Sequence, residues 1–196
     1  MPNSQSLFRA LALSLLPDPF YQAISVDFAA SAEQRLKVLE DYFAYSLGEA
    51  QRTGCSVSAA QVQDGCAAWL LPRAPEVQAR EASAKAAFIA KTLGPLGIAN
   101  YYAIVDFMTP LTGRHVPDNA WYLSILGVHP AAQGRGLGEE LLRPTLHDAS
   151  ARGVPCYLET FAPRSLGFYA RFGFKEVASY DEPITGFPYI IMLRDA

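Results

Sequence analysis

The chain has 196 residues, 51% of them hydrophobic and 12% aromatic, and this length predicts one domain over residues 1–196 with a sizeable hydrophobic core. A formal net charge of −3 argues against nucleic acid as a partner, because a phosphate backbone requires a basic surface. The three cysteines and three histidines lack the spacing of metal ligands, so we expect no metal and free thiols in a reducing cytoplasm.

The first half of the chain predicts helices around a β-hairpin. Helical spacing of apolar residues, with Ser31 as a candidate N-cap of the second helix, predicts helices over residues 4–16, 31–52 and 76–93. Strands are expected over 56–61 and 66–71, joined by a turn at 63–65. The first apolar run is too short to span a bilayer, so no membrane association is expected. Residues 97–108 fit either a helix or a strand, and 109–119 predict a loop.

The second half alternates strands with helices. The strands are expected at residues 120–128, 155–160, 174–180 and 189–194, and the helices at 136–152 and 164–172. Pro144 lies inside the first of these helices and predicts a kink. A hairpin followed by alternating strands and helices predicts an α/β fold with a mixed sheet.

A glycine-rich loop separates the strand at 120–128 from the helix at 136–152. Three glycines, Gly134, Gly136 and Gly138, allow backbone N–H groups to approach an anion closely. The positive end of the helix dipole points to the same place, and Arg135 adds a full charge. The loop therefore predicts a site for a phosphate-bearing cofactor.

Two cofactors compete for this loop. A dinucleotide site would have the glycine spacing G-x-G-x-x-G directly after a strand, with Glu159 as the acid that binds the ribose. Against it, Glu139 stands where the last motif glycine belongs, and residues 129–132 separate the strand from the loop. Fewer than sixty residues follow the loop, which is too few for a full nucleotide-binding sheet. The alternative is coenzyme A, which a family resemblance of this region implies.

Two patterns in this region resemble the GNAT acyltransferase family. The family pattern Gln/Arg-x-x-Gly-x-Gly/Ala after a strand is matched by Gln133, Gly134, Arg135, Gly136, Leu137 and Gly138. A later pattern, a small residue followed by Tyr-x-x-x-Gly-Phe, is matched by Ser165, Tyr169, Gly173 and Phe174. Residues 120–175, Pro144 included, are most similar to the puromycin N-acetyltransferase-like members. The resemblance implies a GNAT fold, in which helices flank a mixed central sheet that is splayed between its two central parallel strands.

The same resemblance implies acetyl-CoA as co-substrate and no metal. Its expected contacts are Leu126, Gly127, Val128, Gln133, Gly134, Arg135, Gly136, Leu137, Gly138, Arg164, Ser165, Phe168 and Tyr169. In the family, the strand before the loop leaves its neighbour at a bulge, and residues 126–128 lie where that bulge would be. A backbone N–H of this segment, that of Val128, is expected to polarise the thioester carbonyl.

Tyr169 and Glu159 are the candidate catalytic residues. The Tyr169 phenol could donate a proton to the leaving thiolate, although spacing alone fits a core tyrosine as well. Glu159 could accept a proton from the amine, with a structural ion pair or a substrate-orienting role as alternatives. His115 and Asp118 are weaker candidates.

The acceptor is expected to contact Glu159 and an aromatic pocket, with an ordinary aromatic core as the alternative. The aromatic residues concerned are Tyr101, Phe107 and Trp121, with Tyr102 and Phe187 as further candidates. Two features depart from the family: Ala162 replaces an Asn that many members carry, and residues 1–5 show no first strand, so the sheet is expected to begin one strand short.

These observations predict an enzyme that acetylates a primary amine of a small molecule by direct attack in a ternary complex. A homodimer is compatible with this prediction. The alternatives are a non-catalytic acyl-CoA sensor and an acetyltransferase of protein N-termini or lysines.

Overall fold

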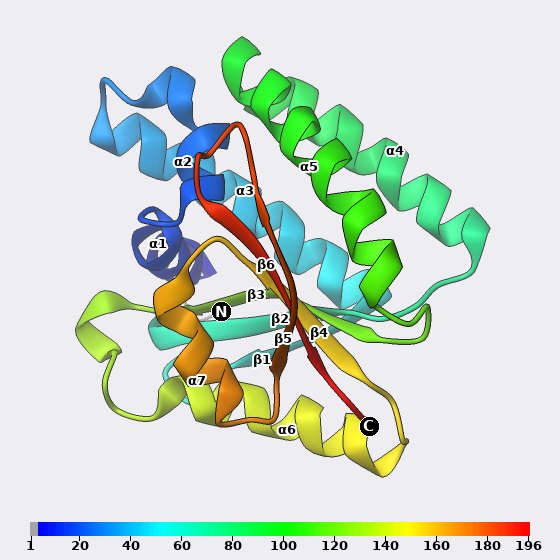
Figure 1. Cartoon of the computed structure of the whole chain (residues 1–196). Coiled ribbons are helices and arrows are strands. Elements are labelled where there is room, and N and C mark those ends of the chain that lie inside the picture. The colour runs from blue at the N-terminus through cyan, green and yellow to red at the C-terminus, as the bar shows by residue number, and fades with distance from the viewer. Residues whose placement is uncertain (1–3) are drawn as a thin grey trace.

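The computed structural model describes residues 4–196, in which a six-stranded mixed sheet lies between helices on both faces (Figure 1). The strands are β1 (Gly54–Ser58), β2 (Gly65–Leu70), β3 (Trp121–Val128), β4 (Cys156–Thr160), β5 (Lys175–Asp181) and β6 (Pro188–Arg194). Their order is β1-β2-β3-β4-β6-β5, and within the described residues β3 and β4 form the one parallel pair. The expected α/β fold with a mixed sheet is confirmed.

The helices separate into two groups by the face of the sheet that they cover. They are α1 (Ser4–Leu15), α2 (Pro19–Ile24), α3 (Ala32–Thr53), α4 (Pro75–Thr92), α5 (Pro95–His115), α6 (Leu137–Ala151) and α7 (Leu166–Ala170). One core joins α1 and α3 to the sheet, a smaller one joins α5 to β6, and the core on the opposite face joins α6 to the central strands. Figure 1 shows α4 and α5 on one side of the sheet, and α6 and α7 on the other side.

The N-terminal helices follow from local capping signals. Ser31 Oγ accepts a hydrogen bond from the Gln34 N–H at 3.4 Å, which confirms the predicted start of α3. The short helix α2 was not expected, yet Asp18 caps it and Pro19 occupies its first position, a pairing common at helix starts. Residues 1–3, part of the segment expected to lack a strand, lie outside the described residues, and α1 begins at Ser4.

The predicted loop over residues 109–119 is wrong for most of its length, because α5 continues to His115 with Pro110 inside it. Proline removes one backbone donor, but helix packing against the core outweighs this loss. Along α5, Tyr101 and Ile104 are buried, and Thr109 Oγ1 donates to the Val105 carbonyl at 2.8 Å. The helix α6 likewise continues across Pro144 without a break.

The hairpin of β1 and β2 is confirmed, although its turn is longer than predicted. Ser58 pairs with Cys66, and a single 3₁₀ turn at Val62–Asp64 lies within the connection.

Each cysteine of the chain is free, and burial raises the pKa of the Cys66 thiol to about 11. Within residues 4–196, no helix combines the length and apolar character that crossing a bilayer requires.

The two parallel strands separate halfway along the sheet. Pairing between β3 and β4 ends at Leu123 and Leu158, so the rest of β3 has no partner on that side. The register between β2 and β3 shifts opposite Leu123 and Ile125, which makes Ser124 the extra residue of a bulge. The bulge was expected at residues 126–128, but these pair regularly with β2, so that prediction is wrong.

Candidate active site

The gap between β3 and β4 exposes backbone groups of β3. Trp121 N–H donates to the Pro155 carbonyl on the β4 side at 2.9 Å, and His129 N–H donates to the Asp64 carbonyl on the β2 side at 2.7 Å. N–H directions alternate along a strand and shift by one residue at a bulge. The N–H groups of Leu126 and Val128 therefore point into the gap.

The loop before α6 presents a row of free donors. Gly136, at φ +83°, is the N-cap of α6, a left-handed conformation that favours glycine. None of the backbone N–H groups of residues 134–138 donates a hydrogen bond within the described part of the chain. The side chain of Gln133 donates to the Val128 carbonyl at 3.0 Å and so connects the loop to the strand end. Strand end, loop and helix start thus form one continuous surface suited to an anion.

The short helix α7 lies against this surface. A β-carbon on Gly138 would meet the Phe168 ring at 3.0 and 3.2 Å, so the glycine permits close packing of α6 and α7. Tyr169 packs edge-on against Phe168, with ring centroids 5.1 Å apart. Burial, with a further contribution from the Asp18 carboxylate, raises the pKa of Tyr169 well above its ordinary value. The phenol therefore keeps its proton near neutral pH.

The turn between β4 and α7 is held by hydroxyl groups. Ser165 Oγ donates to the Ala162 carbonyl at 2.8 Å, and Thr160 Oγ1 accepts from the Ala162 N–H at 3.1 Å. These hydrogen bonds stabilise the turn that contains Ala162. Arg164 is exposed, and its charge acts on Asp18.

A cavity of about 910 Å³ lies between α3, α4, α5 and the sheet. It reaches the gap at Ser124 and Ile125, which line it. Much of its wall is aromatic, including Tyr21, Tyr42, Tyr101, Tyr122, Tyr157 and Phe161. Its volume and apolar walls are typical of a site for a small organic molecule.

Glu159 lies in the wall of this cavity and is held by hydroxyl donors. Thr112 Oγ1 donates to Glu159 Oε1 at 2.5 Å, and Tyr189 Oη donates to the same oxygen. Tyr122 lies nearby, stacked on Tyr157 with ring centroids 4.7 Å apart. Burial and the Glu159 carboxylate hold the pKa of Tyr122 well above its ordinary value. The phenols around Glu159 are therefore neutral, and the carboxylate is a fixed acceptor at the cavity surface.

Asp18 is a second acid at the cavity, one that the sequence analysis missed. Its carboxylate accepts the Phe20 N–H at 2.9 Å as the cap of α2. Burial raises its pKa to about 6, although the Phe20 hydrogen bond and the charge of Arg164 act in the opposite direction. An Asp-Pro pair marks a helix start in the sequence, but nothing in it shows that this carboxylate reaches a cavity.

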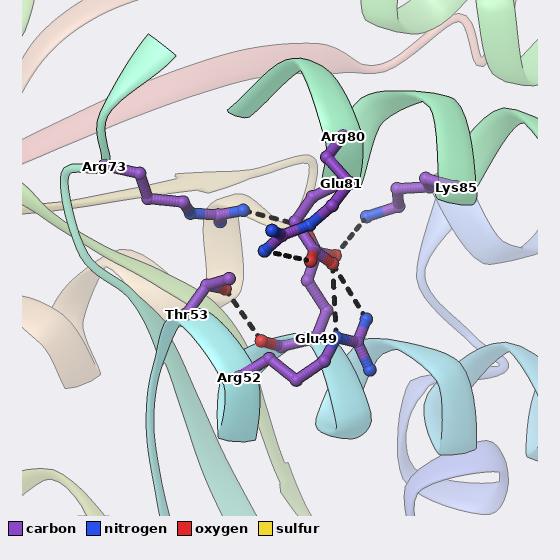
Figure 2. A network of polar contacts seen from close by, with 7 residues as sticks. All are labelled: Glu49, Arg52, Thr53, Arg73, Arg80, Glu81 and Lys85. Atoms are coloured by element: carbon purple, nitrogen blue, oxygen red, sulfur yellow. Dashed lines mark hydrogen bonds and ion pairs between the residues drawn. The ribbon is translucent and has the colours of Figure 1, made fainter. Parts of the chain in front are cut away.

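The charges on the cavity wall divide into two groups. On one side, Glu49 and Glu81 are paired with cations (Figure 2). Asp18, Asp118 and Glu159 also line the cavity, and within the described residues none of these three forms a salt bridge. Unpaired acids in a semi-enclosed space favour a cationic ligand such as an ammonium group.

The structure brings two of the four predicted acceptor-binding residues, Glu159 and Tyr101, to the cavity. Phe107 instead packs against the Tyr189 ring in the core between α5 and β6. Trp121 is buried on the opposite face of the sheet, with the Arg152 guanidinium 5.8 Å from its ring. Their positions therefore do not support contact of Phe107 or Trp121 with the acceptor.

Of the weaker candidate residues, one lines the cavity and three do not. Tyr102 and Phe187 are exposed, and neither is among the cavity-lining residues. His115 Nε2 shares a hydrogen bond with Tyr180 Oη at 2.7 Å, whereas Asp118 lies at the cavity mouth. In the described chain, no group of three or more His, Cys, Asp or Glu side chains is arranged to hold a metal ion.

Comparison with known proteins places this geometry in context. Residues 58–174 match the model of the acetyltransferase (GNAT) family. An uncharacterized N-acetyltransferase of Schizosaccharomyces pombe is 35% identical over 57 residues, which are 29% of this chain and 23% of that protein. A mycothiol acetyltransferase of a Nocardioides species is 43% identical over 53 residues, or 26% and 18% of the two chains. The chain thus matches only about a fifth of the length of these curated relatives.

Two solved structures share the fold over almost the whole chain. A Corynebacterium glutamicum protein described as histone acetyltransferase HPA2 and related acetyltransferase has a TM-score of 0.66 at 17% identity, covering 99% of this chain and 92% of its own. Arylalkylamine N-acetyltransferase 2 from Aedes aegypti has a TM-score of 0.64 at 14% identity, covering 98% and 94%. The narrower resemblance to puromycin N-acetyltransferase-like members stays a prediction.

Proposed function

Because the chain belongs to the GNAT acetyltransferase family, we propose that it transfers the acetyl group of acetyl-CoA to a primary amine of a small molecule, by direct attack in a ternary complex. The observation that carries this proposal is the cavity of about 910 Å³ that meets the gap between β3 and β4 and has Glu159 in its wall. A semi-enclosed aromatic cavity suits a small amine better than a peptide chain, which would need an open groove.

The surface on the other side of the gap suits acetyl-CoA. Free N–H groups at residues 134–138 and the start of α6 would hold its pyrophosphate, and the unpaired edge of β3 would hold its pantetheine arm. A second cavity of about 360 Å³ beside α6 is lined by Arg143, Arg171 and Arg194, whose charges would attract a further phosphate. When bound, acetyl-CoA supplies the acetyl group as a thioester, which the neutral amine attacks with departure of the CoA thiolate.

The residues of the chain would bind, polarise and move protons. The Val128 N–H, which points into the gap, would donate to the thioester carbonyl oxygen. Tyr169 keeps its proton because burial and Asp18 raise its pKa, so it would donate that proton to the thiolate as it leaves. Glu159, whose carboxylate lies in the cavity wall, would accept the proton of the amine.

Asp18 is the competing candidate for the base. Its carboxyl, with a pKa of about 6, is mostly ionised near neutral pH and poised to take up a proton. If Asp18 acts as the base, Glu159 would orient the substrate ammonium, because its Oε1 already accepts from Thr112 and Tyr189.

The experiment is an assay of CoA release with a panel of primary amines, applied to the wild-type protein and to Tyr169→Phe. We expect kcat of the variant to fall by about 10²-fold or more, whereas calorimetry shows unchanged affinity for acetyl-CoA. If Tyr169→Phe turns over at the wild-type rate, Tyr169 is not the proton donor to the thiolate.

The same reagents separate the alternative functions. Binding of acetyl-CoA without turnover of any amine would favour an acyl-CoA sensor. Acetylated proteins in a cell extract incubated with labelled acetyl-CoA, with no small-molecule product detected by mass spectrometry, would favour a protein acetyltransferase.

A further inference from the structure

We propose that the acceptor carries a carboxylate as well as its amine, and that Arg73 and Lys85 bind this carboxylate on the cavity wall away from the gap between β3 and β4. The inference rests on the proposed function, since it takes the cavity as the place where the amine binds. It starts from two cations in the cavity wall whose hydrogen-bonding capacity is largely unused.

These cations belong to a group of charged side chains between α3, α4 and the segment after β2, which we call the basic cluster (Figure 2). Its members are Glu49, Arg52, Arg73, Arg80, Glu81 and Lys85. Glu81 is paired with Arg52 and Arg80, so Arg73 and Lys85 share the single carboxylate of Glu49 and leave one positive charge in excess at the cavity wall. An anionic ligand would neutralise this excess, whereas a second ammonium group would increase it.

Two cations of the cluster, Arg73 and Lys85, line the cavity and make few hydrogen bonds. The Arg73 side chain is 14% exposed, and its one hydrogen bond within the described residues is to Glu49 at 3.5 Å. The Lys85 side chain is 25% exposed and likewise bonds only Glu49 in this part of the chain, at 3.1 Å. A guanidinium has five donors and an ammonium has three. Most donors of these largely buried charges are therefore free for a ligand.

A carboxylate matches these free donors. It can accept two parallel hydrogen bonds from a guanidinium and further ones from an ammonium, and charged pairs of this kind are the stronger hydrogen bonds in proteins. The two other cations of the cluster are less suited to this role. Arg52 and Arg80 are 49% and 69% exposed, bind Glu81, and are not among the cavity-lining residues.

The sheet register places Arg73 and the gap on opposite sides of Tyr122 along the strand direction. Leu70 pairs with Tyr122, and Arg73 lies three residues beyond Leu70. Ser124, at the gap, lies two residues beyond Tyr122 in the opposite direction. At the rise of a strand, Tyr122 and Ser124 are about 7 Å apart along β3, and Arg73 lies farther still from the gap. An α-amino acid holds its two groups too close together to reach both ends. The class of acceptor is therefore an amino carboxylic acid whose groups are separated by several carbon atoms or an aromatic ring.

A matched pair of amines tests the inference on the wild-type protein. The probes are 4-(aminomethyl)benzoate and 4-methylbenzylamine, which differ by a carboxylate in place of a methyl group. We expect kcat/KM for CoA release to be at least tenfold higher with the benzoate, through a lower KM. Equal kcat/KM for the two probes would overturn the carboxylate site.

Three variants then test whether Arg73 binds the carboxylate. Arg73→Met should raise KM for the benzoate about tenfold and leave 4-methylbenzylamine unaffected, and Arg73→Lys should restore part of the loss. Arg80→Met removes a charge from the same cluster without touching the cavity, so it should change neither KM. If Arg73→Met changes both probes equally, or lowers stability without changing the preference, Arg73 has only a structural role and the inference fails.

Binding calorimetry keeps this inference separate from the proposed function. If neither amine is acetylated but the wild-type protein binds the benzoate and Arg73→Met does not, the carboxylate site stands and the proposed activity falls. If both amines are acetylated with equal efficiency, the activity stands and the carboxylate site falls. The wild-type comparison of the two probes decides the question even if Arg73→Met does not fold.

Discussion

Replacement of Asp18 by asparagine should make the protein more stable at neutral pH. The ordinary pKa of this carboxyl is 3.8, and burial raises it to about 6. A difference of this size corresponds to at most about 3 kcal/mol at 1.36 kcal/mol per pKa unit, and because Asp18 is only half-buried we expect about 1–3 kcal/mol. Asparagine keeps an oxygen that can accept the Phe20 N–H, but it cannot ionise.

The sign follows from the direction of the pKa change. Below about pH 3.8, Asp18 is protonated in the folded and the unfolded protein and adds no penalty. As pH rises from about 4 to about 6, the unfolded chain loses this proton first, so the free energy of unfolding falls. Above that window the penalty is fully present and constant. The wild-type protein should therefore lose stability relative to Asp18→Asn across this window.

Urea denaturation of both proteins from pH 4 to pH 8 measures this difference. Asp18→Ala is the matched control, because it also removes the charge but loses the cap, and it should be about 1 kcal/mol less stable than Asp18→Asn. A gap between wild type and Asp18→Asn that stays constant with pH would refute the reasoning. The same variant decides the base: loss of kcat favours Asp18, and retention of kcat favours Glu159.

Two further substitutions test the geometry of the site. Gly138→Val should force the Phe168 ring away from α6 and raise KM for acetyl-CoA several-fold, with little change in kcat; steady-state kinetics in which KM stays the same would contradict the close packing. Thr112→Val should remove the hydrogen bond to Glu159 and the polar contact with Tyr189 Oη, lower the free energy of unfolding by about 1–2 kcal/mol in urea titrations and raise KM for the amine. Thr112→Ser should recover both properties, and equal behaviour of the two variants would show that the hydroxyl has no role.

Local signals predicted most of the elements. Helical periodicity and the Ser31 cap located α1, α3 and α4 within one or two residues, because these signals act within a few turns of chain. The helix α5 was partly missed, since Pro110 and Gly113 are local helix breakers. Its packing against the core and over the cavity, which no short window contains, outweighs them. The position of the bulge at Ser124 depends on the pairing register with β2, which is also non-local.

The residues proposed to bind the cofactor lie in contiguous sequence patterns, whereas the residues of the acceptor cavity do not. Residues 133–138 and Tyr169 lie in two contiguous patterns, and backbone N–H groups bind anions through local conformation. The cavity, by contrast, collects Asp18, Arg73, Lys85 and Glu159 from four distant segments. The cytoplasmic location, the homodimer and the one-domain organisation stay predictions.

By itself, then, the sequence determined most of the elements, the position of the glycine-rich loop and the family, because each depends on residues that are close neighbours in the chain. Only the tertiary structure decided which side chains line the cavity. It places Trp121 on the opposite face of the sheet, brings Asp18 close enough to raise the pKa of Tyr169 and leaves Arg73 and Lys85 with free donors in the cavity wall. The physical reason is that burial, charge pairing and pKa arise from contacts between segments, and those contacts exist only once the sheet has formed.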